Sequence, residues 1–113
     1  MDITLNMRNG KGEIIATLIH SFREVAAADI LKYRSSLAEI ISQAESDPGK
    51  SVKALNKLQR DFWKANCEKA SGYPAPDGAD IMTKANWQDY IMPADFQMAV
   101  NSWFQTFEVI RKN

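Results

Sequence analysis

Apolar and polar side chains alternate at the start of the chain in a way that predicts two β-strands. Between Asp2 and Arg8 every second residue is apolar, and a period of two is typical of a half-buried strand. Residues 9–12 contain an Asn-Gly pair, which favours the positive φ angles of a tight turn. The β-branched segment from Glu13 to Ile19 is then apolar on both faces. We expect a β-hairpin whose apolar face packs on helices or on a partner chain's sheet, because an isolated hairpin is barely stable.

The pattern then changes to helical spacing, and two starting points for the first helix are open. Ser21 and Glu24 fit a capping box, with Ser at the N-cap and Glu three residues later. Alternatively the strand continues to Val25 and the helix starts near Ala26, which we favour because the clearest apolar stripe lies farther along. That stripe consists of Ile30, Leu37, Ile41 and Ala44, with Tyr33 or Arg34 between them. Residues 47–49, Asp-Pro-Gly, end this helix because proline cannot continue it.

Three more helical segments follow. The first has Ser51 as its N-cap and runs to a glycine stop at Gly72. Its apolar positions are Val52, Leu55, Leu58 or Gln59, Phe62 and Ala65. After a loop with two prolines at residues 73–78, residues 84–91 predict a short helix. The last helix begins at Pro93, since proline is tolerated at the first helical position. Its apolar stripe consists of Phe96, Val100, Trp103, Phe107 and Ile110.

These elements predict the fold class α+β, an N-terminal β-hairpin followed by a mostly helical body of three to four helices. A chain of 113 residues fits a single domain. We place that domain at residues 1–113, with the hairpin at residues 1–20 and the helical body at residues 21–113.

Composition narrows the classes of partner and compartment. The 14 Lys and Arg residues balance the 14 Asp and Glu residues, so the chain lacks the positive field of a general nucleic-acid binder, and we expect no nucleic-acid partner. No segment approaches the roughly 20 apolar residues that cross a bilayer, so we expect no membrane partner. The single cysteine, Cys67, excludes an internal disulfide and favours a reducing, cytoplasmic compartment.

Signatures of catalysis are missing from the sequence. His20 has no nucleophile motif beside it, and a structural or surface role is the better interpretation. Cys67 has no oxidoreductase motif and is interpreted as a small, partly buried thiol. The acidic residues form no recognisable pair, and Gly10 and Gly12 lie in a hairpin rather than in a phosphate-binding loop. We therefore predict a protein that is not an enzyme, with no catalytic residue, metal or cofactor.

One helical face carries four cations. They are Lys53, Lys57, Arg60 and Lys64. This face is either a patch for an acidic partner or a solvated helix surface. We favour the solvated surface, because Asp61 and Glu68 lie four residues after Lys57 and Lys64 and neutralise part of the charge.

The aromatic residues are concentrated in the second half of the chain. Nine of the eleven lie after position 60, including two adjacent pairs, and both members of such a pair cannot point inward fully on one helical face. Trp103 follows the last helical stripe and is assigned to the core. Phe104 and Trp63 are predicted to be the exposed members, on a docking or self-association face. Simple core packing of all these side chains is weighed equally.

Several segments resemble a known family. They are the hairpin leading into Phe22–Leu31 with its Arg-Glu-x-x-x-x-Asp opening, Ala70–Pro74, Trp87–Phe96 and Phe104–Phe107. In this order they are similar to the small tail assembly chaperones encoded by tailed phages and prophages. The resemblance implies a non-enzymatic factor in the bacterial host cytoplasm. Such proteins bind the long, largely helical tape-measure protein until tail-tube subunits polymerise around it.

The resemblance also suggests partners and a binding surface. The expected partners are the tape-measure protein or the tail-tube protein, and the chain itself as a homo-oligomer. The hypothetical partner-binding residues are Trp63, Phe104, Lys53, Lys57, Arg60 and Lys64. The aromatic side chains would dock an amphipathic helix and the cations would steer an acidic segment. The alternatives are a structural virion component, such as a head-tail connector or ring-forming protein, and a nucleic-acid-associated module that uses the basic face.

Overall fold

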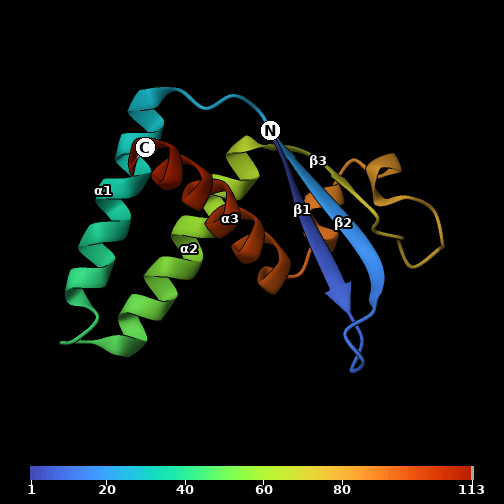
Figure 1. Ribbon diagram of the computed structural model, residues 1–113, viewed down its shortest axis with the longest axis horizontal. Helices are drawn as coiled ribbons and strands as arrows, with labels where there is room; N and C mark the ends of the chain where they lie inside the picture. The colour runs from blue at the N-terminus through green and yellow to red at the C-terminus, as the bar shows by residue number, and fades with distance from the viewer. Residues whose placement is uncertain (113) are drawn as a thin grey trace.

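The protein is an α+β fold in which three helices lie to one side of a small antiparallel sheet (Figure 1). The computed structural model describes residues 1–112, and side chains as far as residue 106. The strands are β1 (Asp2–Arg8), β2 (Ile14–Phe22) and β3 (Cys67–Ser71), in the order β1-β2-β3. The α-helices are α1 (Ala27–Gln43), α2 (Pro48–Asn66) and α3 (Pro93–Lys112). The prediction of an N-terminal hairpin and a mostly helical body is confirmed.

The hairpin forms where the alternating pattern places it. Leu5 pairs with Leu18 in an antiparallel register, and both side chains are buried on the face that the helices cover. At the turn, the Asn9 side-chain oxygen accepts hydrogen bonds from the backbone N–H groups of Lys11 and Glu13. β2 continues to Phe22, so the hairpin extends two residues beyond the predicted end at residue 20.

The third strand corrects the prediction of one long helix ending at Gly72. The helix stops at Asn66, and Cys67–Ser71 pairs with β2 instead. The strand therefore joins the hairpin from within the segment predicted to be entirely helical. Gly72 follows with φ 90°, and a Cβ at this position would lie 2.5 Å from the carbonyl oxygen of Thr17. Glycine is required there because the chain turns away in contact with the backbone of β2.

The helix α1 begins at Ala27, as the favoured later start predicted. The strand that precedes it ends at Phe22 and does not continue to Val25, because residues 23–26 cross from the sheet to the helix. Ser21 belongs to β2, so the alternative capping box does not form. Tyr33 is the buried residue of this helix, and Ile30 and Leu37 pack partly against the core. Ile41 was predicted to belong to the same stripe but is exposed. The reason is that α1 packs on the core along its N-terminal half, whereas its C-terminal half contacts α2 at the end of the molecule (Figure 1).

The helix α2 starts earlier than predicted and buries a different face. Asp47, not Ser51, is the N-cap, and its side chain accepts a hydrogen bond from the backbone N–H of Lys50. Val52 and Ala65 were predicted to be core residues but are exposed. The buried residues are Ser51, Gln59, Phe62, Trp63 and Asn66. This helix packs between α1 and α3, so its buried surface is wider than one stripe and includes polar side chains that find hydrogen-bond partners.

The segment before α3 differs from the predicted helix at residues 84–91. It contains two short 3₁₀ turns, Ile81–Thr83 and Trp87–Tyr90, with an extended residue, Lys84, after the first. The start of α3 at Pro93 is confirmed. Phe96, Val100 and Trp103 of its stripe are buried as predicted. The side chains of Phe107 and Ile110 lie outside the described part of the chain.

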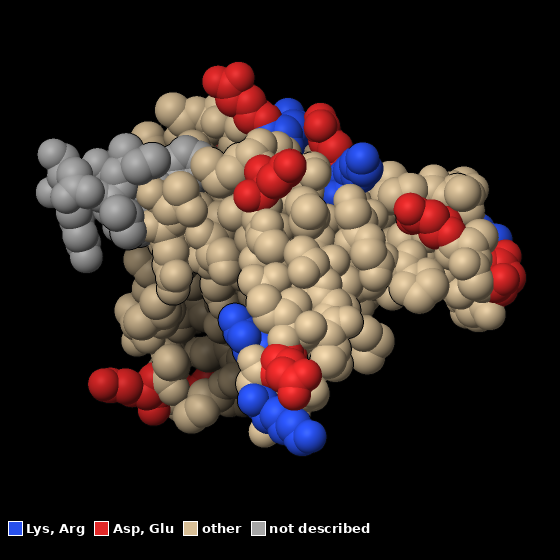
Figure 2. Space-filling model, turned by 45° about the vertical axis from the view of Figure 1, so that its right-hand side comes forward, with Lys and Arg blue, Asp and Glu red and all other residues tan. Residues whose placement is uncertain are grey.

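Among residues 1–112, none of the helices is both long enough and apolar enough to cross a bilayer. Acidic and basic side chains lie close to one another on the face shown in Figure 2, without a broad area of one sign. This pattern agrees with the zero net charge of the sequence.

Candidate functional site

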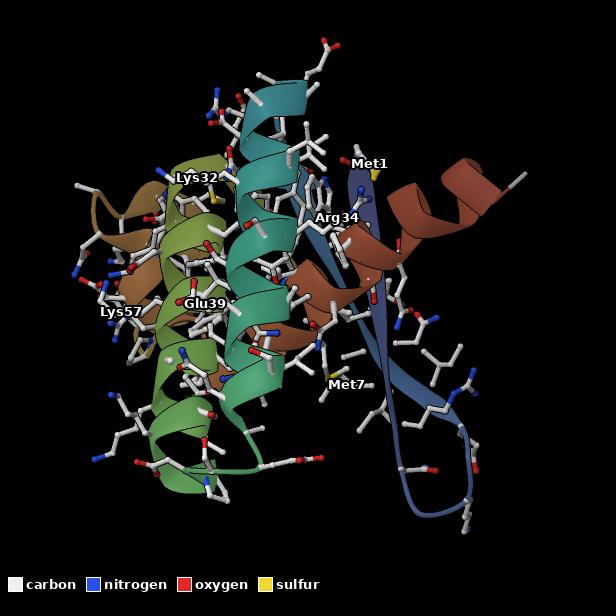
Figure 3. All side chains as sticks on the ribbon, turned by 90° about the vertical axis from the view of Figure 1, so that its left-hand side faces the viewer. Met1, Met7, Lys32, Arg34, Glu39 and Lys57 are labelled. Atoms are coloured by element: carbon white, nitrogen blue, oxygen red, sulfur yellow. The ribbon has the colours of Figure 1, made fainter. Side chains whose placement is uncertain are left out.

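A groove of about 370 Å³ lies between the N-terminal half of α1 and the C-terminal half of α2, and it is open to solvent. Figure 3 shows the two helices side by side, with Lys32 labelled on α1 and Lys57 on α2. The lining residues are Arg23, Asp29, Lys32, Tyr33, Ser36, Leu58, Asp61, Phe62, Ala65 and Asn66. On each helix these positions recur at three- and four-residue spacing, so they form one continuous face.

The base of the groove is formed by apolar and aromatic side chains that pack against α3. The rings of Tyr33 and Phe62 lie 4.8 Å apart across the two helices, and Phe62 lies 4.5 Å from Trp103 of α3. Leu58 is half-buried and extends this surface along α2. Because the aromatic rings pack against a third helix, the groove is supported by the core and needs no rearrangement to form.

The rim of the groove carries both signs of charge. Arg23 donates a hydrogen bond from Nε to the side-chain oxygen of Asn66 at 3.0 Å. This hydrogen bond holds together the end of the groove that lies nearest to the sheet. Lys57 donates to Asp61 at 2.6 Å, and this hydrogen bond lowers the pKa of the Asp61 carboxyl. Such a rim, with an apolar base, is typical of surfaces that bind amphipathic protein segments.

The four cations form a ridge along the exposed side of α2, next to the groove. We call Lys53, Lys57, Arg60 and Lys64 the basic ridge. Lys57 and Arg60 lie 2.6 and 3.9 Å from Asp61, and Lys64 lies 3.7 Å from Asp89. The Lys57–Asp61 pair is the neutralising contact that the sequence predicted, whereas Lys64 pairs across the fold. Exposed pairs of this kind contribute little to stability, about 0–1 kcal/mol.

Trp63 is not on a docking surface, contrary to the sequence prediction. Its side chain is 0% exposed. The indole ring stacks on Phe96 with centroids 5.5 Å apart and meets Trp87 edge to face at 5.7 Å. The prediction was wrong because α2 is covered on two sides: Phe62 packs toward α1, and its neighbour Trp63 packs toward β2 and α3.

Phe104 is half-buried rather than fully exposed. It packs on Tyr33 with ring centroids 5.4 Å apart, and the guanidinium of Arg34 lies 5.8 Å from its ring centre. Figure 3 shows Arg34 reaching from α1 toward α3. Phe104 therefore links these helices and offers a partner only part of its ring. The assignment of its neighbour Trp103 to the core is confirmed.

His20 is the buried centre of a hydrogen-bond chain that the sequence did not reveal, and the outer members of this chain, Tyr73 and Asp95, are half-buried. Its Nδ1 accepts from the indole N–H of Trp63 at 2.9 Å, and its Nε2 lies 2.7 Å from the hydroxyl of Tyr73. Tyr73 in turn donates to Asp95 at 3.1 Å. Burial lowers the pKa of His20, although Asp95 opposes that shift, and burial raises the pKa of Tyr73. The chain joins β2, α2, the loop after β3, and α3.

Cys67 is the first residue of β3, not part of a helix, and it is buried. Burial raises the pKa of its thiol to about 11, so the sulfur is protonated at neutral pH. The thiol donates to the backbone oxygen of Lys69 at 3.3 Å. Within the described residues, no group of three or more His, Cys, Asp or Glu side chains is arranged to hold a metal ion.

Comparisons with protein-family models, with curated proteins and with solved structures find no match to this chain.

Proposed function

We propose that the protein is a non-enzymatic tail assembly chaperone of a tailed phage or prophage, and that it binds a helical segment of the tape-measure protein. The observation that carries the proposal is the groove between α1 and α2, with Tyr33, Leu58 and Phe62 at its base. An open apolar groove between two helices accepts an amphipathic helix as a third helix. The segmental resemblance to tail assembly chaperones supports the choice of partner.

The openness of the groove to solvent, rather than its size, favours a helix over a small ligand. Two packed helices leave room for a third at an interaxial distance of about 8–10 Å. A small-molecule site would enclose most of its ligand, whereas this groove is open to solvent. The basic ridge on α2 runs beside it, so we expect the bound helix to present acidic side chains on the flank that faces α2.

The buried reactive groups support a role without catalysis. His20 is 0% exposed and uses both ring nitrogens in hydrogen bonds within the fold. Cys67 carries a protonated thiol inside the sheet. Neither group meets solvent, where a substrate would have to approach it.

Co-expression tests this function directly. A tape-measure protein from the genome that encodes this chain is produced with and without it, and the soluble fraction and co-purification of the tape-measure protein are measured. We expect co-purification with the wild-type protein and loss with Ala65→Glu, which places a charge in the groove at an exposed helical position. Ala38→Glu is the matched control, because Ala38 is an exposed alanine of α1 outside the groove. Equal binding by both variants would exclude the groove as the binding site. Failure of the wild-type protein to bind or to solubilise the tape-measure protein would contradict the function.

A structural virion component is the alternative, and the exposed apolar end of the hairpin favours it. Ile14 and Ile15 are exposed there, as a ring-forming protein requires before assembly. Quantitative mass spectrometry of purified particles separates the two functions. A chaperone is absent from the finished virion, whereas a connector or ring protein is present in fixed stoichiometry.

A further inference from the structure

The hydrogen-bond chain gives the two ring nitrogens of His20 unlike neighbours. Nδ1 faces the indole N–H of Trp63 on α2, and Nε2 faces the hydroxyl of Tyr73, which donates to Asp95 of α3. An indole N–H can only donate a hydrogen bond, whereas a hydroxyl both donates and accepts. The contact with α2 therefore requires an unprotonated Nδ1, while the contact with Tyr73 exists in both charge states of the imidazole.

A second proton on His20 has opposite effects on these two contacts. Imidazolium carries an N–H on both nitrogens, so the new N–H at Nδ1 would meet the N–H of Trp63 and that hydrogen bond would be lost. The hydrogen bond from Nε2 to Tyr73 would become charge-assisted, which strengthens it. The Asp95 carboxylate on the far side of the hydroxyl would balance the new charge. Protonation thus detaches β2 from α2 and tightens its attachment to α3.

The side chains packed around His20 make Asp95 the charge that acts on it. Ile3 of β1 and Ala70 of β3 lie opposite His20 in the sheet and carry no titratable group. The loop after β3 contributes the hydroxyl of Tyr73, whose pKa is raised by burial and is therefore neutral. Burial lowers the pKa of His20, and among the described residues Asp95 opposes this shift. The imidazole therefore takes up its second proton below the ordinary value of 6.5.

Cys67 offers another acceptor for the indole N–H of Trp63. It lies four residues after Trp63, at the start of β3, and it is buried. Burial raises the pKa of its thiol to about 11, and a hydrogen bond with the Trp63 side chain is among the weaker effects that oppose this rise. A thiol sulfur is a weak acceptor. An indole N–H displaced from His20 therefore has a partner nearby and need not be left unpaired in the core.

We propose that His20 is a pH-operated switch between two hydrogen-bond arrangements of the folded chain. In the neutral arrangement the Trp63 indole binds Nδ1 of His20 and joins α2 to β2. In the protonated arrangement the indole N–H binds the Cys67 sulfur, and His20 joins the sheet to α3 through Tyr73 and Asp95. The proton comes from solvent. Because α2 also forms one wall of the groove, the switch changes how that wall is attached to the sheet.

Nitrogen NMR of the full chain tests the switch, in a titration from about pH 8 to about pH 4.5 that brackets the ordinary histidine pKa. The chain has one histidine, so its imidazole signals are identified directly. The Trp63 indole signal is the one that Trp63→Phe removes. We expect the imidazole to gain its second proton in the folded protein below pH 6.5, and the Trp63 indole signal to shift with the same midpoint. The amide signals of the hairpin should show that the sheet persists.

Three results of this titration would overturn the inference. The first is a Trp63 indole signal that stays fixed while the imidazole titrates. The second is an imidazole that remains neutral throughout the range. The third is cooperative unfolding of the whole chain without a folded, protonated form, because the acid response would then be global rather than a local exchange of hydrogen bonds.

Two variants should move the midpoint of the histidine titration in opposite directions. Trp63→Phe removes the donor that favours the neutral imidazole, so the midpoint should rise by about half a unit or more. Asp95→Asn removes the charge that favours the imidazolium, so the midpoint should fall by about as much. Glu13→Gln is the matched control for charge, because Glu13 is exposed at the turn of the hairpin. Midpoints that stay at the wild-type value in both variants would contradict the switch.

Substitutions of Cys67 test the second arrangement. Cys67→Ala removes the acceptor of the protonated form, so the midpoint should fall. Cys67→Ser keeps a small side chain with an acceptor, and its midpoint should stay close to that of the wild-type chain. Circular dichroism at neutral pH establishes that each variant is folded. A Cys67→Ala midpoint equal to that of the wild-type chain would show that the indole N–H does not move to the sulfur.

Discussion

The indole N–H of Trp63 donates a hydrogen bond to Nδ1 of His20 at 2.9 Å, with both side chains fully buried. Indole is only a donor, so Nδ1 must be the unprotonated nitrogen of a neutral imidazole. The proton then resides on Nε2 and points at the Tyr73 hydroxyl, which itself donates to Asp95. One hydrogen-bond chain thus assigns the tautomer of the histidine and fastens four elements together.

Acid should destabilise the fold through His20. Burial lowers its folded pKa below the ordinary value of 6.5, so the unfolded chain binds this proton at a higher pH than the folded one. The free energy of unfolding should therefore fall as the pH drops below about 6.5, until the pH reaches the folded pKa. Urea denaturation at pH values between 8 and 5, which lie about one to two units on either side of the unfolded pKa of 6.5, measures this fall in the free energy of unfolding. His20→Gln should show a smaller slope in this window, and an unchanged slope would mean that other groups cause the acid sensitivity.

Trp63→Phe should cost about 1–3 kcal/mol, because it leaves Nδ1 of His20 buried without a donor. Trp63→Ala should cost about 3–5 kcal/mol, as large core truncations do, and Trp103→Ala should match it. Denaturant midpoints give these differences directly. If Trp63→Ala were within a few tenths of a kcal/mol of wild type, the side chain would be exposed in solution after all.

Gly72→Ala should destabilise the protein more than Gly78→Ala. Both glycines have positive φ, 90° and 85°, and the unfavourable backbone conformation costs about 1–3 kcal/mol in either variant. At Gly72 the new Cβ would also lie 2.5 Å from the Thr17 oxygen, whereas nothing lies within 4 Å at Gly78. Thermal unfolding of the two variants separates the cost of the close contact between the new Cβ and the Thr17 oxygen from the cost of the positive φ angle. Equal losses would show that the loop moves away from β2 at little cost.

The basic ridge should matter little for stability. Lys53→Gln together with Lys57→Gln should change the free energy of unfolding by less than about 0.5 kcal/mol, because both side chains are solvated. Tape-measure binding gives the second measurement. A salt-dependent loss in this variant would show that the ridge contacts the partner, and unchanged binding would leave it a solvated surface.

Cys67 should be unreactive in the folded protein. A buried thiol with a pKa of about 11 exposes almost no thiolate at pH 8. Labelling with a thiol reagent should be slow in buffer and fast in denaturant, with one thiol per chain. Rapid labelling of the native protein would mean that β3 opens readily.

The local elements that depend on short-range chemistry were predictable from the sequence. The alternation from Asp2 to Arg8 and the Asn-Gly turn predicted the hairpin, because strand period and turn geometry depend on residues within reach of one another. Pro93 marked the start of α3 for the same reason, and the stripe led by Phe96 identified its buried face.

The tertiary structure decided which faces are buried and where the groove lies. Cys67–Ser71 continues a pattern that is compatible with a helix, and the open edge of β2 makes it a strand. Trp63 is buried because α2 has neighbours on two sides, whereas the sequence pattern was interpreted as one stripe with one neighbour. The groove residues Asp29 and Ser36 resemble any solvated helix surface in the sequence. Periodicity reports that a helix has a buried side, but the number and direction of its neighbours arise only when the chain folds.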